Sequence, residues 1–179
     1  VSVEALMAVA DSDAYLNYAA VEALGRAANP ETAQRIAVYL GGRLNAQDLK
    51  VLSAAITAYG RLMGYEAVPA LVEVIRSNRV RGDGFETMVL TAAVETLGRI
   101  SSAAAAAVLI EELGRSSEKG WSLEYGSVVV HALGMLNTPE GNAALRTYAD
   151  GLAAKRPADP LAGRYYDVKI SEAKKAAGM

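Results

Sequence analysis

The chain has 179 residues, a formal net charge of −2 and no cysteine. This charge provides no general attraction for a phosphate backbone, which argues against nucleic-acid binding. The lack of cysteine excludes disulfides, a thiolate nucleophile and a Cys-ligated metal. Hydrophobic residues make up 52% of the chain, with only one Phe and one Trp, so small aliphatic side chains dominate and favour closely packed helices over a sheet.

The longest nearly apolar run, Ser101 to Ile110, has about ten residues. A bilayer-spanning helix needs roughly twenty, so we expect no transmembrane span. The chain begins at Val1 in a helix-like pattern, which suggests a fragment or a processed form whose targeting segment lies outside the sequence. The compartment and the oligomeric state therefore stay open.

The first predicted element is a helix over residues 3–10, which we expect to cover the first full repeat. After it, a similar phrase occurs four times and is closed each time by a glycine: Gly25, Gly60, Gly98 and Gly134. These glycines are separated by 35, 38 and 36 residues. A period of this length indicates stacked supersecondary units, each of which buries its apolar face against a neighbour.

The residues before each glycine predict a first helix, helix A. Positions nine, five and one before the glycine share one helical face and are apolar, as in Leu16, Ala20 and Leu24 or in Val51, Ala55 and Tyr59. The third position before the glycine belongs to the polar side and holds Glu22, Thr57, Glu95 and His131. We expect the glycine to end helix A as a C′ residue in the left-handed conformation.

The residues after each glycine predict a second helix, helix B. Positions eleven and fifteen form its apolar stripe, which holds Ile36, Leu40, Leu71, Ile75, Leu109, Leu113, Leu145 and Ala149. Its start is marked twice by a capping residue, a proline and a glutamate, in Asn29-Pro30-Glu31 and Thr138-Pro139-Glu140. Proline suits the first helical position, and the carboxylate faces the positive end of the helix.

The predicted fold class is all-α, an α-solenoid of about four helical hairpins with capping terminal helices. We predict a single domain over residues 1–179. Residues 1–12 form the N-terminal cap, residues 13–152 the four repeats, and residues 153–179 a linker and a C-terminal capping helix that begins near Tyr165.

The Ala-Leu-Gly phrase of helix A and the Ala67-Val68-Pro69-Ala70-Leu71 start of helix B resemble the HEAT repeat, particularly the bacterial type of the phycobilisome lyases. The resemblance covers roughly residues 13–152. It implies an armadillo-like superhelix that acts as a scaffold or adaptor and whose B helices line the concave side. On that geometry it nominates as protein-binding residues Gln34, Tyr39, Glu73, Arg76, Glu111, Glu112 and Tyr148.

Trp121 lies in a polar connector between the third and fourth repeats. Tryptophan is over-represented among interface hot spots, so we add Trp121 to the predicted protein-binding residues. The alternative, on equal terms, is that it folds back and fills the gap between these repeats.

Arg26, Arg61 and Arg99 directly follow the first three repeat glycines. We interpret each as a cation at the carbonyl end of helix A, where it is favoured by a few tenths to about 1 kcal/mol. The alternative is a basic ladder for an acidic partner. His131, the only histidine, occupies a polar position, so we predict an exposed residue without a catalytic or metal role.

The sequence shows no convergent catalytic set. We therefore predict a non-enzymatic scaffold or adaptor that binds a partner protein or peptide on its concave face and uses no cofactor and no metal. The enzymatic alternative, implied by the resemblance alone, is a lyase or chaperone-lyase subunit that acts on a prosthetic group such as a bilin. Nucleic-acid binding, as in HEAT-like glycosylases, needs a continuous basic groove, and we predict no nucleic-acid partner.

Overall fold

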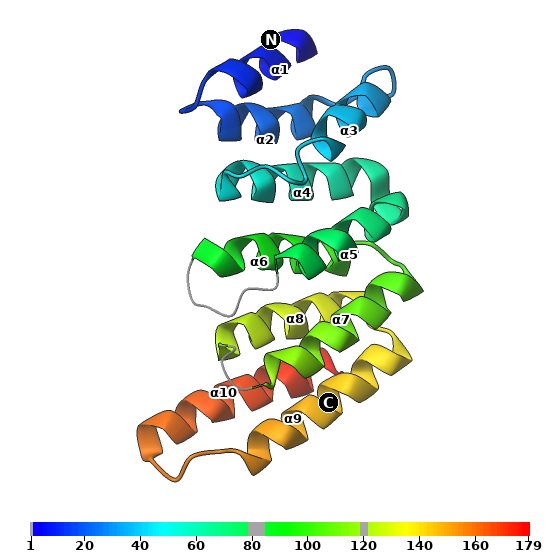
Figure 1. The fold of residues 1–179 in the computed structure, drawn as a ribbon. Coiled ribbons are helices and arrows are strands. Elements are labelled where there is room, and N and C mark those ends of the chain that lie inside the picture. The colour runs from blue at the N-terminus through cyan, green and yellow to red at the C-terminus, as the bar shows by residue number, and fades with distance from the viewer. Residues whose placement is uncertain (1, 79–84, 119–121) are drawn as a thin grey trace. The chain divides into compact units, whose positions relative to one another are not determined.

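The computed structural model describes residues 2–78, 85–118 and 122–179. All regular elements in these ranges are helices: α1 Val3–Ser12, α2 Asn17–Ala27, α3 Ala33–Gly41, α4 Leu49–Met63, the 3-10 helix η1 Gly64–Ala67, α5 Val68–Ser77, α6 Phe85–Gly98, α7 Ala103–Ser116, α8 Leu123–Leu136, α9 Pro139–Ala154 and α10 Pro160–Ala176. The helices pack against their neighbours in chain order (Figure 1), so the predicted all-α solenoid of helical hairpins is confirmed.

The described residues form two compact units, and the boundary lies between Thr96 and Leu97 in α6. Unit 1 contains α1 to α5 and α6 up to Thr96. Unit 2 begins at Leu97 and contains α7 to α10. That residues 1–179 form one domain, with caps over residues 1–12 and 153–179, stays a prediction.

In unit 1 the helices α1, α2, α4 and α6 form one layer, and α3 and α5 form the other (Figure 1). Helix α2 packs against α1 and α4, and α3 packs against α4. The A helices are therefore α2, α4 and α6, and the B helices are α3 and α5. The predicted B-helix stripe is confirmed in this unit, because Ile36, Leu40, Leu71 and Ile75 are completely buried.

In unit 2, α8 packs against α7, α9 and α10. Helix α9 begins at Pro139 as predicted, and the Thr138 side chain accepts a hydrogen bond of 3.1 Å from the Gly141 N–H. Helix α10 begins at Pro160, earlier than the predicted start near Tyr165. The reason is that the Asp159 carboxylate caps it, accepting from the backbone N–H groups of the second and third residues of the helix.

An ion pair ties the linker before α10 to the body of that helix. Arg156 donates through Nε and Nη2 to the two carboxylate oxygens of Asp167, over 2.7 and 2.8 Å. These hydrogen bonds lower the pKa of the Asp167 carboxyl. Gly163 makes room for the guanidinium, since a Cβ on this glycine would stand 2.9 Å from Arg156 Cζ.

The first repeat departs from its predicted pattern at two places. Leu16 was expected on the apolar stripe, but it precedes α2 and is 52% exposed because the Asp13 side chain holds the chain in a turn there. Pro30 was expected to start helix B, but α3 begins at Ala33. The Asn29 side chain accepts from the two N–H groups after Pro30, so these residues form a turn before the helix.

The repeat glycines do not end their helices in the left-handed conformation, and this prediction was wrong. Three of them lie inside α2, α4 and α8, and Gly98 is the last residue of α6. None of the four has a positive φ. Positive φ angles occur elsewhere among the described residues, at Gly64 after α4 with φ 55°, at Asn137 after α8 with φ 48° and at Gly178 after α10 with φ 73°.

Each repeat glycine of unit 1 instead faces a small side chain of the next A helix. A Cβ on Gly25 would stand 2.5 Å from Ala58 Cβ, and a Cβ on Gly60 would stand 2.1 Å from Thr96 Cγ2. Packed side chains do not approach this closely. Glycine is therefore required at these positions by the short distance between neighbouring A helices.

The same contact recurs in unit 2. A Cβ on Gly98 would stand 2.7 Å from Ala132 Cα in α8, and a Cβ on Gly134 would stand 3.0 Å from Ala176 Cβ in α10. Helix α10 thus receives the α8 glycine as an A helix would. At Gly98 the obstacle includes backbone atoms, which no change of rotamer can move.

We predict that Gly98→Ala lowers the free energy of unfolding of the chain by about 1–3 kcal/mol, because the new methyl group overpacks the contact with Ala132. Gly114→Ala, in the same unit, is the matched control, since a Cβ on Gly114 would meet nothing within 4 Å. It should stabilise α7 by about 0.5–1 kcal/mol through helix propensity. Urea unfolding measures both changes, and equal effects of the two substitutions would contradict the close approach.

Candidate functional site

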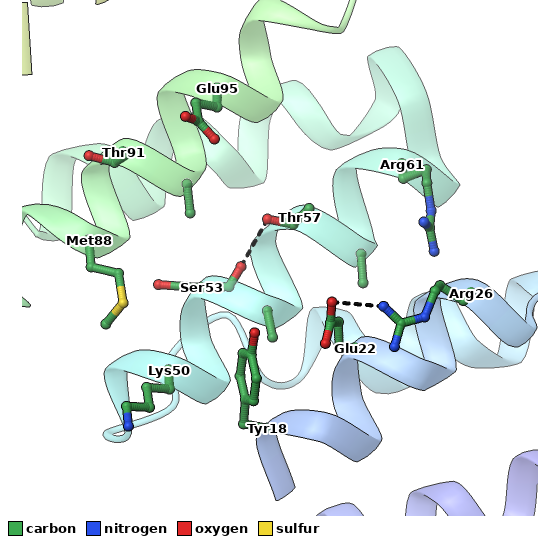
Figure 2. A pocket seen from close by; sticks show the side chains of 13 residues that line it. Tyr18, Glu22, Arg26, Lys50, Ser53, Thr57, Arg61, Met88, Thr91 and Glu95 are labelled. Atoms are coloured by element: carbon green, nitrogen blue, oxygen red, sulfur yellow. Dashed lines mark hydrogen bonds and ion pairs between the residues drawn. The ribbon is translucent and has the colours of Figure 1, made fainter. Parts of the chain in front are cut away.

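The solvent-facing side of the A helices in unit 1 carries a groove of about 600 Å³. It runs along α4, its lining comes from α2, α4 and α6, and we name it the A-helix groove (Figure 2). It is lined by Tyr18, Glu22, Arg26, Lys50, Ser53, Ala54, Thr57, Ala58, Arg61, Met88, Thr91, Ala92 and Glu95.

The lining residues occupy equivalent positions of the three repeats. The row seven residues before the repeat glycine holds Tyr18, Ser53 and Thr91. The row three residues before it holds Glu22, Thr57 and Glu95. Because neighbouring A helices pack against one another at their glycines, equivalent side chains from three helices face one groove.

Cations stand at the two ends of the A-helix groove (Figure 2). Lys50 lies near the start of α4, and Arg26 and Arg61 lie near the ends of α2 and α4. Arg26 donates to the Glu22 carboxylate over 2.7 Å. Within the described ranges, neither Lys50 nor Arg61 has an ion-pair partner.

Hydroxyl groups line the middle of the groove. The Thr57 hydroxyl donates to the Ser53 carbonyl oxygen over 3.1 Å, which leaves its lone pairs free to accept. The Ser53 Oγ is enclosed and has no hydrogen-bond partner among the described residues. The groove therefore contains hydrogen-bonding capacity that the fold itself does not use.

One end of the groove is aromatic and open to solvent. Tyr18 lines this end and is 42% exposed. Met88 on α6 adds a flexible apolar side chain to the same groove.

In the ranges covered by the structure, no cluster of three or more His, Asp or Glu side chains is placed to hold a metal ion. None of the helices in those ranges combines the length and the apolar character that a membrane span requires.

Residues 3–84 match the family model of HEAT repeats. The matched segment carries HEAT repeats. The matched segment includes α1 to α5, and with them the α2 and α4 sides of the A-helix groove. The predicted HEAT resemblance is thus confirmed, whereas the phycobilisome-lyase type stays a prediction. Neither the comparison with curated proteins nor that with solved structures gave a match.

The residues nominated on the B helices of unit 1 lie away from the A-helix groove. Gln34, Glu73 and Arg76 are exposed on α3 and α5. Glu73 lines a separate hollow of about 530 Å³ beside the loop between α3 and α4. Their role in a HEAT-repeat interface stays a prediction.

Tyr39 is half-buried and holds α3 against α1. Its hydroxyl donates to Asp11 Oδ1 over 2.7 Å and lies 3.2 Å from the Met7 carbonyl oxygen. Arg43, which is paired with Asp11, places its guanidinium carbon 4.6 Å from the centre of the Tyr39 ring. Burial raises the pKa of the Tyr39 hydroxyl. These contacts give Tyr39 a structural role within the repeat array.

In unit 2 the nominated residues divide between surface and interior. Glu111 is exposed and pairs with Arg115 over 3.0 Å. Glu112 is completely buried, and Tyr148 is only 7% exposed, with its pKa raised by burial. Trp121 lies outside the described residues. Glu112 and Tyr148 therefore offer almost no side-chain surface to a partner in this conformation.

The sequence contains a signal for the A-helix groove. The position three residues before each glycine, predicted to belong to the polar side of helix A, lines the groove in the first three repeats. The same register, extended to the position seven residues before the glycine, adds Tyr18, Ser53 and Thr91. Equivalent polar positions on consecutive repeats face one groove once the helices are stacked.

We predict that Tyr125→Phe lowers the free energy of unfolding by about 1–3 kcal/mol, because it removes a hydrogen-bond donor from a buried carboxylate. Tyr125 donates to Glu112 Oε2 over 3.0 Å, and both side chains are buried. Tyr65→Phe is the control, since Tyr65 is 71% exposed. Denaturant unfolding of the two variants measures the change in the free energy of unfolding. An unchanged value for Tyr125→Phe would show that this hydrogen bond does not contribute to stability.

Proposed function

We propose that the chain is a non-enzymatic HEAT-repeat module that binds a peptide segment of a partner protein in the A-helix groove. The observation that supports this proposal is that three consecutive A helices contribute equivalent side chains to one open groove. Repeat arrays of this class present extended surfaces to partners, and their functions reside in such surfaces rather than in the fold itself.

The chemistry of the groove suits a peptide in an extended conformation. An extended segment leaves its N–H and C=O groups unpaired, and these need partners when they are taken out of water. The hydroxyls of Thr57 and Thr91 and the Glu95 carboxylate can supply such partners. A helical segment pairs its own backbone groups and would make little use of this lining.

Two alternatives have less support. The exposed B-helix residues Gln34, Glu73 and Arg76 are another location for the same function, on the surface that the HEAT resemblance nominated. The lyase alternative rests on the resemblance to phycobilisome lyases, and the A-helix groove is lined by neither Cys nor His. A change in the absorbance of an added bilin on mixing with the chain would support that alternative.

The proposal predicts that a random dodecapeptide library displayed on phage yields peptides that bind in the A-helix groove. Thr57→Arg should weaken these peptides by about tenfold or more, because the long side chain fills the middle of the groove. Thr147→Arg is the matched control. Thr147 is also exposed and also donates to the carbonyl oxygen four residues earlier, but it lies on α9.

The expected result is full binding by the Thr147→Arg variant and weakened binding by Thr57→Arg, measured by fluorescence anisotropy with synthetic copies of the selected peptides. Selection of no peptide would overturn the proposal. Peptides that bind the Thr57→Arg variant as well as the wild type would place the binding surface elsewhere.

A further inference from the structure

We propose that the A-helix groove selects acidic segments. A carboxylate of the bound segment pairs with Arg61, and an apolar side chain three or four residues away packs between Tyr18 and Met88. This inference rests on the proposed function, since it names the chemistry of the peptide that the groove takes.

Arg61 is the cation best placed to receive a carboxylate. Its guanidinium lies over the bare backbone of Gly25, where a Cβ would stand 3.1 Å from Nη2. Arg26, at the equivalent repeat position, is already paired with Glu22. Arg61 is exposed at the groove and has no carboxylate partner in the described part of the chain. A planar guanidinium in this state can form two parallel hydrogen bonds to one carboxylate.

The neighbouring carboxylates limit the kind of anion that fits. Glu22 and Glu95 lie in the row next to Arg61, and like charges at short distance repel. A phosphate group carries more negative charge than a carboxylate, and a nucleic acid brings one charge per nucleotide. The charges of the lining therefore favour a single carboxylate at the Arg61 end, followed by a residue without negative charge opposite Glu95.

The distance between the two ends sets the spacing of the motif. On α4, Ser53 lies in the same row as Tyr18, and Arg61 follows Ser53 by eight residues. This separation corresponds to about 12 Å at 1.5 Å per residue. An extended peptide covers this distance in three or four residues, at about 3.3 Å each. The apolar side chain meets Tyr18 and Met88, which are the large apolar groups of the lining.

The test uses the peptides selected from the phage library and synthetic copies of them. We expect Asp or Glu to be enriched three or four residues from an apolar residue. Replacing that acid by its amide should weaken binding to the wild-type chain by about tenfold, and Arg61→Gln should weaken the unaltered peptide equally. With both changes together the loss should be no larger than with either alone, because they remove the same ion pair.

Arg99→Gln is the control, since Arg99 follows its repeat glycine as Arg61 does, is exposed, and does not line the groove. Its binding should equal that of the wild type. Peptides that lose affinity on Thr57→Arg but show no acid preference and no response to Arg61→Gln would overturn this inference and leave the proposed function intact.

Selection of no peptide for the groove would overturn both the inference and the proposed function. Self-association of the chain that Thr57→Arg abolishes would assign the groove to a second copy of the chain, and it would overturn the peptide proposal as well.

Discussion

The contact between each repeat glycine and the next A helix is the constraint on which the rest of the structure depends. Gly25 against Ala58, and Gly98 against Ala132, leave no room for even one carbon atom. Helices whose backbones approach closely make many dispersion contacts with one another. The small residues on both helices allow this approach. Since the glycine recurs once per repeat, it fixes the same relation between successive A helices.

That relation also produces the candidate site. When neighbouring A helices contact at equivalent positions, their equivalent polar side chains come to one face, and a groove forms along the middle helix. Ala54 and Ala58 keep its lining small, while Arg61 lies over Gly25. The residue that allows close packing thus also provides the bare backbone on which the Arg61 guanidinium rests.

Much of the fold could be predicted from the sequence because burial leaves a periodic trace. The repeat length, the B-helix stripe from Ile36 onward and the cap at Thr138 all follow from local patterns, and the structure confirms them. The packing role of the repeat glycines could not be predicted from local sequence patterns. A glycine that ends a helix and a glycine that allows close helix packing both follow the last apolar residue of helix A. Only the position of the next helix distinguishes these two roles.

The candidate site was harder to predict for the same reason. Tyr39 was expected to bind a partner protein, but its hydroxyl contacts Asp11 and Met7 of α1, far away in the sequence. Glu112 was expected at the surface, and it is buried because Tyr125 on the next helix supplies a hydrogen bond. Such partners depend on which helices meet, and a repeat pattern alone does not specify the side chains that stand opposite one another.

The most direct measurement of the central claim is a methyl-resolved NOE spectrum of the chain in solution. We expect strong cross-peaks from the Gly25 Hα protons to the Ala58 methyl group and from the Gly60 Hα protons to the Thr96 methyl group. Strong cross-peaks at these pairs require the helices to approach as closely as the structure shows. Their absence, with the methyl and glycine signals assigned and sharp, would contradict the glycine contact and with it the arrangement of the groove.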